Sequence, residues 1–396
     1  MKKQFLILLI MLGFSTLFAQ VDYKIDAQIR PRFEVNNENF NANVSPVTFT
    51  GMRSRIGLKL FAGKNLSAYF QVQDTRIWGQ EISTLAIDRN LGVHQAYVII
   101  DKFLSKSLEL KFGRMEVNFG PQRLVGAVGW SNVGRSFDGL ILKLKKEKFD
   151  MQFFAFQEAE NWKPDEMTDK FFSGVYTNFK LSKNYKLQPF LLWDRDFAAS
   201  TGRATIGAYI TGKMKKFFHE TEFAYQTGKI GGMDIKAYMF AFNAGFKFTK
   251  KFTLKAGIDY LSGDDNIVDN EYKSFNTLYA TNHKYYGFMD MFLNLPVHTL
   301  GVGLNDMHVK ADLKASKKII LKAAFHIFNS AQERTLISGG TSNKFGSELD
   351  ITAVCTYSKN VKFQLGYSMF TPGEIFKDIG RKDNASWAYV MAIVNF

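Results

Sequence analysis

The sequence predicts an all-β fold, a closed antiparallel transmembrane β-barrel of about 18 strands with short periplasmic turns and long extracellular loops. Three observations predict it: long segments in which apolar and polar residues alternate, connections of contrasting length, and an unusual composition. Aromatic residues make up 15% of the 396 residues, yet 22% are charged and the mean hydropathy is only -0.15. A barrel wall explains this combination, because every second strand residue faces hydrocarbon and the others face water.

The N-terminus has the pattern of a secretory signal peptide. Lys2 and Lys3 precede an apolar run from Phe5 to Phe18, which ends at Ala19. We therefore expect residues 1–19 to be removed and residues 20–396 to form a single outer-membrane β-barrel domain. No later stretch reaches about 18 apolar residues, so we expect no membrane-spanning helix. Export combined with amphipathic strands predicts the outer membrane of a Gram-negative bacterium.

The first strand shows the alternation most clearly. From Asp22 to Val35 every second residue is apolar, Pro31 included. A period of two over this length predicts a strand with one face in lipid and the other in water. Pro31 lacks an amide hydrogen for the ladder, so we expect it at a bulge or at the rim. The same reasoning predicts strands at 22–35, 49–62, 65–75, 92–101, 107–115, 137–145, 149–157, 171–181, 185–194, 203–212, 217–226, 235–248, 251–261, 302–314, 318–328, 346–357, 361–370 and 386–396.

The connections between these segments alternate in length. Short turns fall at 63–65, 146–148, 182–184, 249–251, 316–318 and 358–360, and long loops at 36–48, 76–91, 116–136, 158–170, 262–301, 329–345 and 371–385. Short turns face the periplasm and long loops face outward in barrels of this kind. Nearly every short turn carries lysine, so we expect much of the net charge of +14 to lie beside lipid headgroups.

The remaining composition limits the partners. A strongly basic chain can bind nucleic acid, but a secreted one does not meet it, so we expect no nucleic-acid partner. Outer-membrane lipid is expected around the wall, and the terminal Phe396 on an amphipathic last strand indicates recognition by the outer-membrane assembly machinery. The single cysteine, Cys355, cannot form an internal disulfide. It should face lipid, because it shares a strand face with Ile351 and Ala353.

Arginine is distributed differently from lysine. Four arginines fall on polar strand faces: Arg30, Arg32, Arg53 and Arg55. Three lie in or beside the longest early loop: Arg114, Arg123 and Arg135. A planar, permanently charged guanidinium suits a pore lining for acidic sugars or other anions, and this hypothesis predicts an open lumen along the first four. Alternatively the arginines pair with acids on the same polar faces, namely Glu34, Glu109, Asp259, Glu348 and Asp350.

Several blocks of residues resemble the alginate-export family of outer-membrane proteins. They are Gly113-Arg114-Met115-Glu116 with Gly120, Gln122-Arg123-Leu124-Val125-Gly126, Trp130-Ser131-Asn132, Arg135-Ser136-Phe137-Asp138-Gly139, Ser262-Gly263-Asp264-Asp265, Phe275-Asn276-Thr277-Leu278-Tyr279, His283 to Asp290, and Gly346-Ser347-Glu348-Leu349-Asp350. The resemblance covers most of the mature chain in the expected order.

The resemblance implies a monomeric eighteen-stranded barrel whose arginine-rich constriction passes an anionic polysaccharide such as alginate. It assigns Arg114, Arg123, Arg135 and Asp138 to that constriction. Met115 stands where the family pattern has Gln, and the long periplasmic turn that plugs the exporter is missing here. We therefore keep passage of acidic oligosaccharides or small anions, and a general porin of other substrate, as alternatives. The sequence leaves the direction of transport open.

We expect no catalytic residues, no metal site and no cofactor. The acidic loop at 264–271 lacks the EF-hand order and is interpreted as solvated. His298 and His308 have no zinc spacing. A rim lipase built on His326, Asn329 and Ser330, or a glycosidase pair of Glu158 and Glu160, would make the chain an enzyme or surface binding protein on a blocked barrel. The channel is favoured because arginine recurs on strand faces while no catalytic set recurs near a loop.

Overall fold

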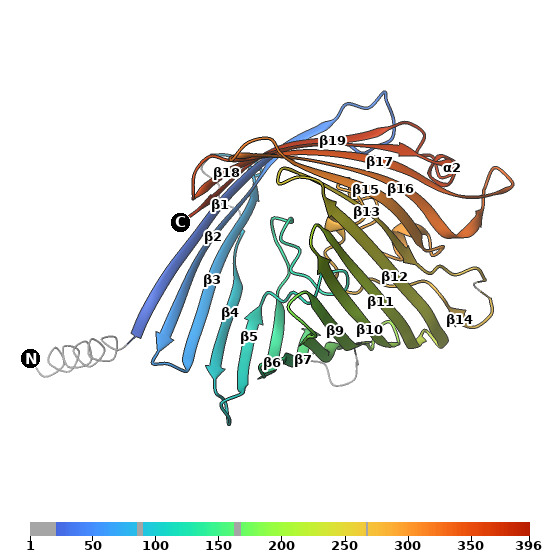
Figure 1. Ribbon diagram of the computed structural model, residues 1–396. Coiled ribbons are helices and arrows are strands. Elements are labelled where there is room, and N and C mark those ends of the chain that lie inside the picture. Colours follow the sequence, from blue (N-terminus) through green and yellow to red (C-terminus); the bar gives the residue numbers. More distant parts are fainter. Residues whose placement is uncertain (1–20, 85–89, 162–167, 267) are drawn as a thin grey trace, which may run out of the picture.

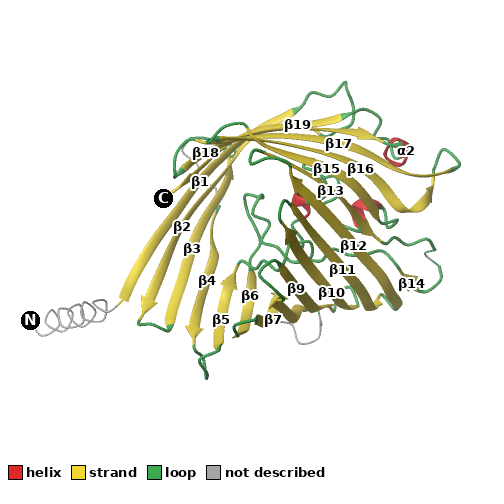
Figure 2. Cartoon of the chain, viewed as in Figure 1, coloured by secondary structure: helices red, strands yellow, loops and turns green. Residues whose placement is uncertain are grey.

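The chain forms one closed antiparallel barrel (Figures 1 and 2). The computed structural model describes residues 21–84, 90–161, 168–266 and 268–396, so the predicted signal peptide lies outside the described residues. Nineteen strands form a single sheet that closes because β1 pairs with both β2 and β19. β14 has only two residues and pairs in parallel with β12, which leaves eighteen long wall strands.

The wall strands occupy the predicted positions. Their bounds are β1 Val21–Asn37, β2 Val47–Ala62, β3 Leu66–Ile77, β4 Leu91–Asp101, β5 Leu108–Met115, β6 Phe137–Lys145, β7 Phe149–Ala159, β8 Lys170–Lys180, β9 Tyr185–Asp196, β10 Thr201–Met214, β11 Phe217–Ile230, β12 Met233–Lys247, β13 Phe252–Leu261, β15 Leu304–Lys314, β16 Ile319–Thr335, β17 Thr341–Thr356, β18 Val361–Pro372 and β19 Ala385–Asn395. The predicted eighteen-stranded barrel is confirmed.

Within the described ranges, helical structure is confined to the loops between wall strands. Besides β14 (Glu271–Tyr272), the long connection from β13 to β15 contains the short helices η1 (Asn282–Lys284) and η2 (Val297–Thr299). α2 (Glu374–Asp378) lies between β18 and β19. None of the helices among the described residues is long and apolar enough to cross a membrane.

Two details of the sheet differ from expectation. Pro31 lies in the middle of β1 rather than at the rim, and the ladder from β1 to β19 is interrupted there, with no β19 partner for Arg30 or Pro31. The loop expected at 329–345 is mostly strand, since β16 and β17 run on and leave only residues 336–340 between them. Register shifts after Phe328 and Asn329 break the period of two, which is why the sequence pattern ended too early.

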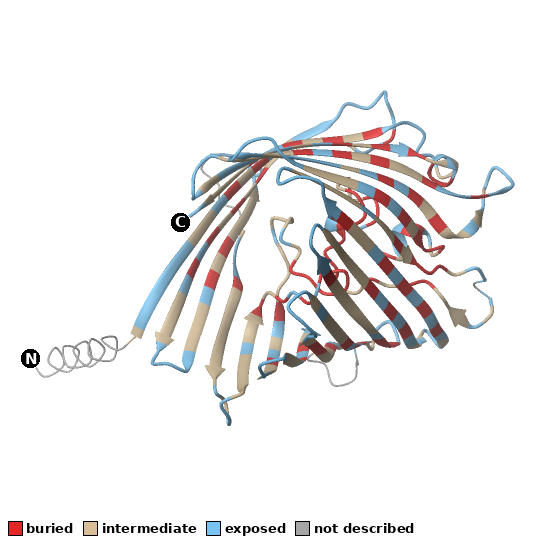
Figure 3. Ribbon diagram, in the orientation of Figure 1, coloured by how far each residue is buried: buried red, intermediate tan, exposed pale blue. Residues whose placement is uncertain are grey.

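Burial alternates along the wall strands as the sequence pattern requires (Figure 3). On β17, for example, Glu348, Asp350 and Thr352 are buried inside the barrel while Ile351 is 48% exposed on the outside. Large apolar side chains are exposed in the same way on nearly every wall strand, and a continuous apolar band of this kind is stable in hydrocarbon but not in water. The outward face is therefore the lipid-facing face, and the polar face lines the lumen.

The lumen is filled from within at about mid-height. The loop between β5 and β6 turns into the barrel interior (Figure 1) and meets the long loop between β13 and β15 there. Their buried residues include Val117, Phe119, Val125, Phe275 and Tyr286. The hydrophobic core of the molecule thus lies between these loops and the inner wall.

Cys355 supplies a test of the strand faces. It lies opposite Ile319 on β16 and Phe363 on β18, both apolar and outward-facing. In the folded barrel in detergent micelles, which cover the wall and leave both ends in water, we expect a bulky water-soluble maleimide to label Cys355 about tenfold or more slowly than Lys359→Cys, placed in the adjoining exposed turn of a Cys355→Ser background. Equal labelling rates for the two thiols would mean that Cys355 does not face lipid.

Candidate functional site: the barrel lumen and its plug

Two inward loops form a plug across the lumen. We define the plug as residues 116–136, from the loop after β5, and residues 274–292, from the loop after β13. Val125 and Tyr279 form a parallel bridge, in which the amide of Gly126 donates to the carbonyl of Tyr279 at 2.8 Å and the amide of Tyr279 donates to that of Leu124 at 2.9 Å. The amide of Thr281 donates to Gln122 at 2.9 Å. The two loops are thus held together by backbone hydrogen bonds.

Glycine permits two of the closest approaches in the plug. A β-carbon on Gly126 would lie 2.1 Å from the hydroxyl of Thr281, so a side chain there would separate the two loops. Gly287 has a φ of +82°, and a β-carbon on it would lie 2.4 Å from the carboxylate of Glu348. Glu348 accepts a hydrogen bond from the amide of Met289 at 2.8 Å, which anchors the second loop to β17.

The arginines of β1 and β2 hold the first loop by its backbone carbonyls. Arg30 donates to the carbonyls of Gly129, Trp130 and Ser131 at 2.8–2.9 Å. Arg53, directly opposite Arg30 in the sheet, donates to Gly129 and Ser131 at 3.1 Å. Because a guanidinium offers five donors in a fixed plane, adjacent arginines can hold a whole turn of backbone.

Arg32 and Arg55 complete this arginine cluster, which we define as Arg30, Arg32, Arg53 and Arg55. Arg32 donates to the carbonyl of Trp130 and pairs with Glu34 at 2.7 Å, and its guanidinium lies 4.3 Å from the Trp130 ring centroid. All four residues are at most 9% exposed. The expectation that they line an open lumen was therefore wrong, because the first loop covers them.

Arg55 connects the cluster to the start of the first loop. It donates to Gln73 at 2.6 Å and to Glu116 at 3.0 Å, and Glu116 also contacts His94 at 2.7 Å. Burial raises the pKa of Glu116, but the hydrogen bond from His94 and the charge of Arg55 outweigh it, so that the pKa lies below its ordinary value. Glu116 is therefore ionised and fixes the point where the chain leaves the wall.

Arg123 anchors the other side of the first loop in a buried ion cluster. Its guanidinium pairs with Asp259 on β13 and lies 3.4 Å from Glu222 and 3.6 Å from Glu220 on β11. Burial alone would lower the pKa of Arg123, but Asp259 and the other acidic groups outweigh it and the pKa lies above its ordinary value. The guanidinium also lies over the ring of Tyr285 at 4.0 Å, which ties it to the second loop.

Of the remaining predicted residues, Arg135 joins the two loops of the plug, Asp350 lies on the inner wall, and Arg114 and Asp138 form a pair outside the lumen. Arg135 donates to the carbonyls of Gly126, Tyr279 and Ala280, so it joins the two loops. Asp350 is buried on the inner wall and accepts a hydrogen bond from Ser368 at 2.5 Å.

Arg114 and Asp138 form that external pair. They pair with each other at 2.5 Å, with side chains 42% and 56% exposed. Both share the outward face of their strands with Phe112 and Leu140. The structure thus places them on the outer surface of the wall, instead of at a constriction.

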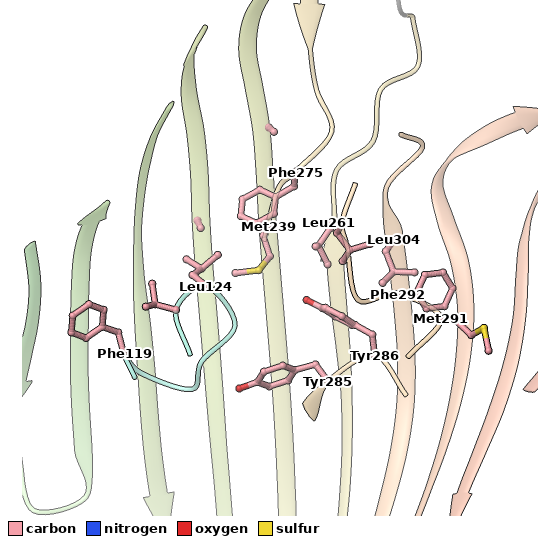
Figure 4. Close-up of a cluster of buried hydrophobic side chains, with 14 of the residues drawn as sticks. Phe119, Leu124, Met239, Leu261, Phe275, Tyr285, Tyr286, Met291, Phe292 and Leu304 are labelled. Carbon is pink, nitrogen blue, oxygen red and sulfur yellow. The ribbon is translucent and has the colours of Figure 1, made fainter. Parts of the chain in front are cut away.

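Aromatic and apolar contacts fill the space around these polar anchors. Trp130 stacks on His283 with ring centroids 4.5 Å apart, and so joins the first loop to the second. Figure 4 shows Phe119 and Leu124 of the first loop, and Phe275, Tyr285 and Tyr286 of the second, against Met239, Leu261 and Leu304 of the wall. The plug is therefore packed like a protein core, with polar anchors at its edges.

A second group of cations lines the lumen on the side of the short turns. Two adjoining pockets of about 410 and 270 Å³ share Lys255, Lys284 and Lys310, and Lys322 lines the smaller one. We call these four residues the lysine cluster. Lys255 pairs with Asp312 at 2.6 Å. Among the described residues, no carboxylate lies within ion-pair distance of the other three.

Sequence reasoning assigned lysine to the membrane surface and missed this cluster. A signal was present, because Lys255 shares a polar strand face with Asp259, and Lys322 shares one with His326. The pairing of Lys255 directly opposite Lys310 could not be seen without the register. Nor could the position of Lys284, which depends on the second loop folding inward.

The described residues of the acidic loop and of the other groups considered from sequence have partners of their own. Lys273 pairs with Asp265 and Asp269 at 2.9 and 2.8 Å, so these two carboxylates of the acidic loop are already paired with a cation. Ser330 donates to the carbonyl of Gln332 rather than to His326. Glu158 accepts a hydrogen bond from Tyr279 of the plug.

Comparison with known proteins agrees with this architecture. The family model for alginate export matches residues 21–389. The chain belongs to the alginate export family. It is an outer-membrane β-barrel of a Gram-negative bacterium, and as a member of this family it shares the barrel with outer-membrane porins. No curated protein matches the sequence.

Three solved porin structures have a fold similar to that of this alginate export family member over nearly their whole length. OccK11 (OpdR) of Pseudomonas aeruginosa has a TM-score of 0.65 at 9% identity, covering 95% of this chain and 96% of its own. OpdK of the same organism has a TM-score of 0.63 at 12% identity, with coverages of 95% and 98%. OccAB4 of Acinetobacter baumannii has a TM-score of 0.62 at 10% identity, also with 95% and 98%.

The buried ion cluster predicts how firmly the plug is held. Arg123→Met leaves Asp259 and Glu222 without their cation, and breaking a buried pair in this way costs about 3–5 kcal/mol. We expect the first loop to leave its seat, with faster chymotrypsin cleavage near Trp130 and a larger single-channel conductance.

The matched control is Lys229→Met, which breaks the exposed pair with Asp234 between the ends of β11 and β12 and should change neither readout. The double variant Arg123→Met with Asp259→Asn should recover part of the loss, because no unpaired acid remains at position 259. A plug that resists protease equally well in the wild type and in Arg123→Met would show that Arg123 does not hold it.

Proposed function

We propose that this protein is an anion-selective outer-membrane channel for small acidic solutes and short acidic saccharides, with the route passing beside the plug and over the lysine cluster. The observation that carries the proposal is the convergence of Lys255, Lys284, Lys310 and Lys322 on two adjoining pockets of the lumen. Three of them have no carboxylate partner among the described residues. Lys284 donates one hydrogen bond to the carbonyl of Pro121 at 3.1 Å, which leaves its positive charge and two further N–H donors for a passing anion.

Electrostatic focusing supports the choice of an anion. Positive groups in a confined lumen with low-dielectric walls raise the local concentration of counter-ions. Lysine suits transit better than arginine, because a single ammonium point charge binds carboxylates less rigidly than a planar guanidinium. The arginine cluster, in contrast, is occupied by backbone carbonyls of the plug and by Glu34 and Glu116.

The plug limits the size of the solute that can pass. Its packed aromatic core and four-arginine anchor occupy the middle of the lumen, which favours small anions and short or extended chains over a bulky polymer. The family description of alginate export makes polymers of acidic sugars the first polysaccharides to examine. Uptake and export are equally compatible with a passive channel.

The lysine cluster predicts the ion preference of the channel. In planar bilayers under a salt gradient we expect a reversal potential of anion-selective sign for the wild type. Lys284→Glu with Lys322→Glu should lower the anion-to-cation permeability ratio by about threefold or more, most strongly at low salt where screening is weak. Both side chains are exposed to the lumen, so the variant should fold normally.

The matched control is Lys183→Glu with Lys317→Glu, which makes the same change in net charge on the exposed short turns. It should leave the reversal potential nearly unchanged. If the control pair shifts the potential as much as the luminal pair, the selectivity comes from the overall charge and the proposed route is wrong.

The pH dependence of selectivity gives an independent test. Enclosure in the lumen and the charge of Arg123 lower the pKa of Lys284 below its ordinary value, although Glu220 partly opposes them. Because a lowered pKa means that the ammonium is lost at lower pH, anion selectivity should begin to fall before the ordinary lysine pKa of about 10.4 is reached. Lys284→Gln should remove this early part of the titration of the reversal potential, and an unchanged curve would exclude Lys284 from the route.

A further inference from the structure

Two histidines and an aspartate meet on the inner wall between the two lysine-lined pockets. Asp306 and His308 lie two residues apart on one face of β15, and His326 lies opposite His308 on β16. His308 lines the larger pocket and His326 the smaller one. The side chain of Asp306 is fully buried, and those of His308 and His326 are nearly so.

The three side chains direct their ligand atoms toward one point. The Nδ1 atom of His326 lies 2.8 and 3.0 Å from the two carboxylate oxygens of Asp306, and the Nδ1 atom of His308 lies 3.1 Å from one of them. All the candidate donor atoms lie within 4.8 Å of one another. A tetrahedral cation about 2.0–2.2 Å from each donor needs donors about 3.4 Å apart, so small side-chain rotations that open the 2.8–3.1 Å hydrogen bonds would admit it.

A neighbouring amide defines which nitrogen of His308 carries its hydrogen. The Nε2 atom of His308 lies 2.6 Å from the side-chain oxygen of Asn243, whose amide nitrogen faces the carboxylate of Asp259 at 3.5 Å. With the amide in this orientation, His308 Nε2 donates its hydrogen to Asn243. The neutral imidazole then presents its Nδ1 lone pair to the carboxylate of Asp306, so a proton or a metal cation must lie between the two.

We propose that Asp306, His308 and His326 form a binding site for a divalent transition-metal ion such as Zn²⁺ or Co²⁺. Two imidazoles and one carboxylate suit these ions, and a water from either pocket completes the coordination. Asn243 is the positioning residue, because a metal-bound histidine commonly donates its other ring N–H to a fixed acceptor. The pockets on both sides give the ion a path to the site.

Lys310 lowers the affinity of the proposed site for a metal ion. It follows His308 by two residues on the same inward face and lines both pockets, so its ammonium repels a cation at the site. Lys310→Met should consequently bind the metal more tightly than the wild type. A gain in metal affinity in Lys310→Met distinguishes a metal site from a merely hydrogen-bonded cluster, whose metal affinity the substitution should not change.

The test uses the full-length mature barrel, purified without a histidine tag and folded in detergent. Titration with Co²⁺ should give visible d–d absorption bands at one ion per barrel, and calorimetry with Zn²⁺ should give the same stoichiometry. His308→Ala, His326→Ala and Asp306→Asn should abolish both signals. Asn243→Leu should weaken binding by about 10- to 100-fold without changing the stoichiometry.

The matched control is His219→Ala, which removes another histidine of the larger pocket and should bind as the wild type does. Heat-modifiable migration on gels verifies that each variant is a folded barrel. The proposal is overturned if the folded wild type shows no stoichiometric Co²⁺ band, or if Asp306→Asn binds as tightly as the wild type. Either result would leave a proton, and no metal, between His308 and Asp306.

Discussion

Four arginines on the inner faces of β1 and β2 need hydrogen-bond acceptors, and the plug is organised around meeting that need. A buried guanidinium without acceptors is costly, because each unpaired donor loses its hydration. The backbone carbonyls from Gly129 to Val133 supply those acceptors, together with Glu34 and Glu116. The first loop therefore folds into the barrel, and the second loop follows it through the bridge between Val125 and Tyr279.

The wall could be predicted from the sequence because lipid and water impose a strict alternation. All eighteen wall strands fall where they were predicted, the last one from its position before the terminal Phe396 more than from alternation. The pattern failed where the register shifts beside Asn329. The alternation is the same whether an inward polar side chain faces open water or is covered by a loop folded against it. This is why Arg30 and Arg53 were correctly placed on the inner face but wrongly expected to line an open lumen.

Loop residues were harder to place for a second reason. A resemblance in sequence blocks identifies Arg114, Arg123 and Arg135 together, yet one lies on the outer surface, one in a buried ion cluster and one between the two loops. Their roles depend on strand parity and on contacts with acids more than a hundred positions away, such as Asp259. The inner lysines show the converse, because their strand faces were visible while their convergence required the register and the inward fold of Lys284.

The position of Trp130 has a consequence for how the barrel assembles. Its ring lies against Arg32 of β1 and makes edge contacts with Trp387 and Tyr389 of β19, at centroid distances of 5.7 and 5.0 Å. β1 and β19 are the two ends of the sheet, and the seam between them is the last ladder that the chain can complete. The first loop thus contacts both strands of the seam from inside the barrel. All of these contacts can form only after β1 and β19 have paired. The seat of Trp130 therefore depends on barrel closure, and in an unclosed barrel the first loop would lack its contacts with β19.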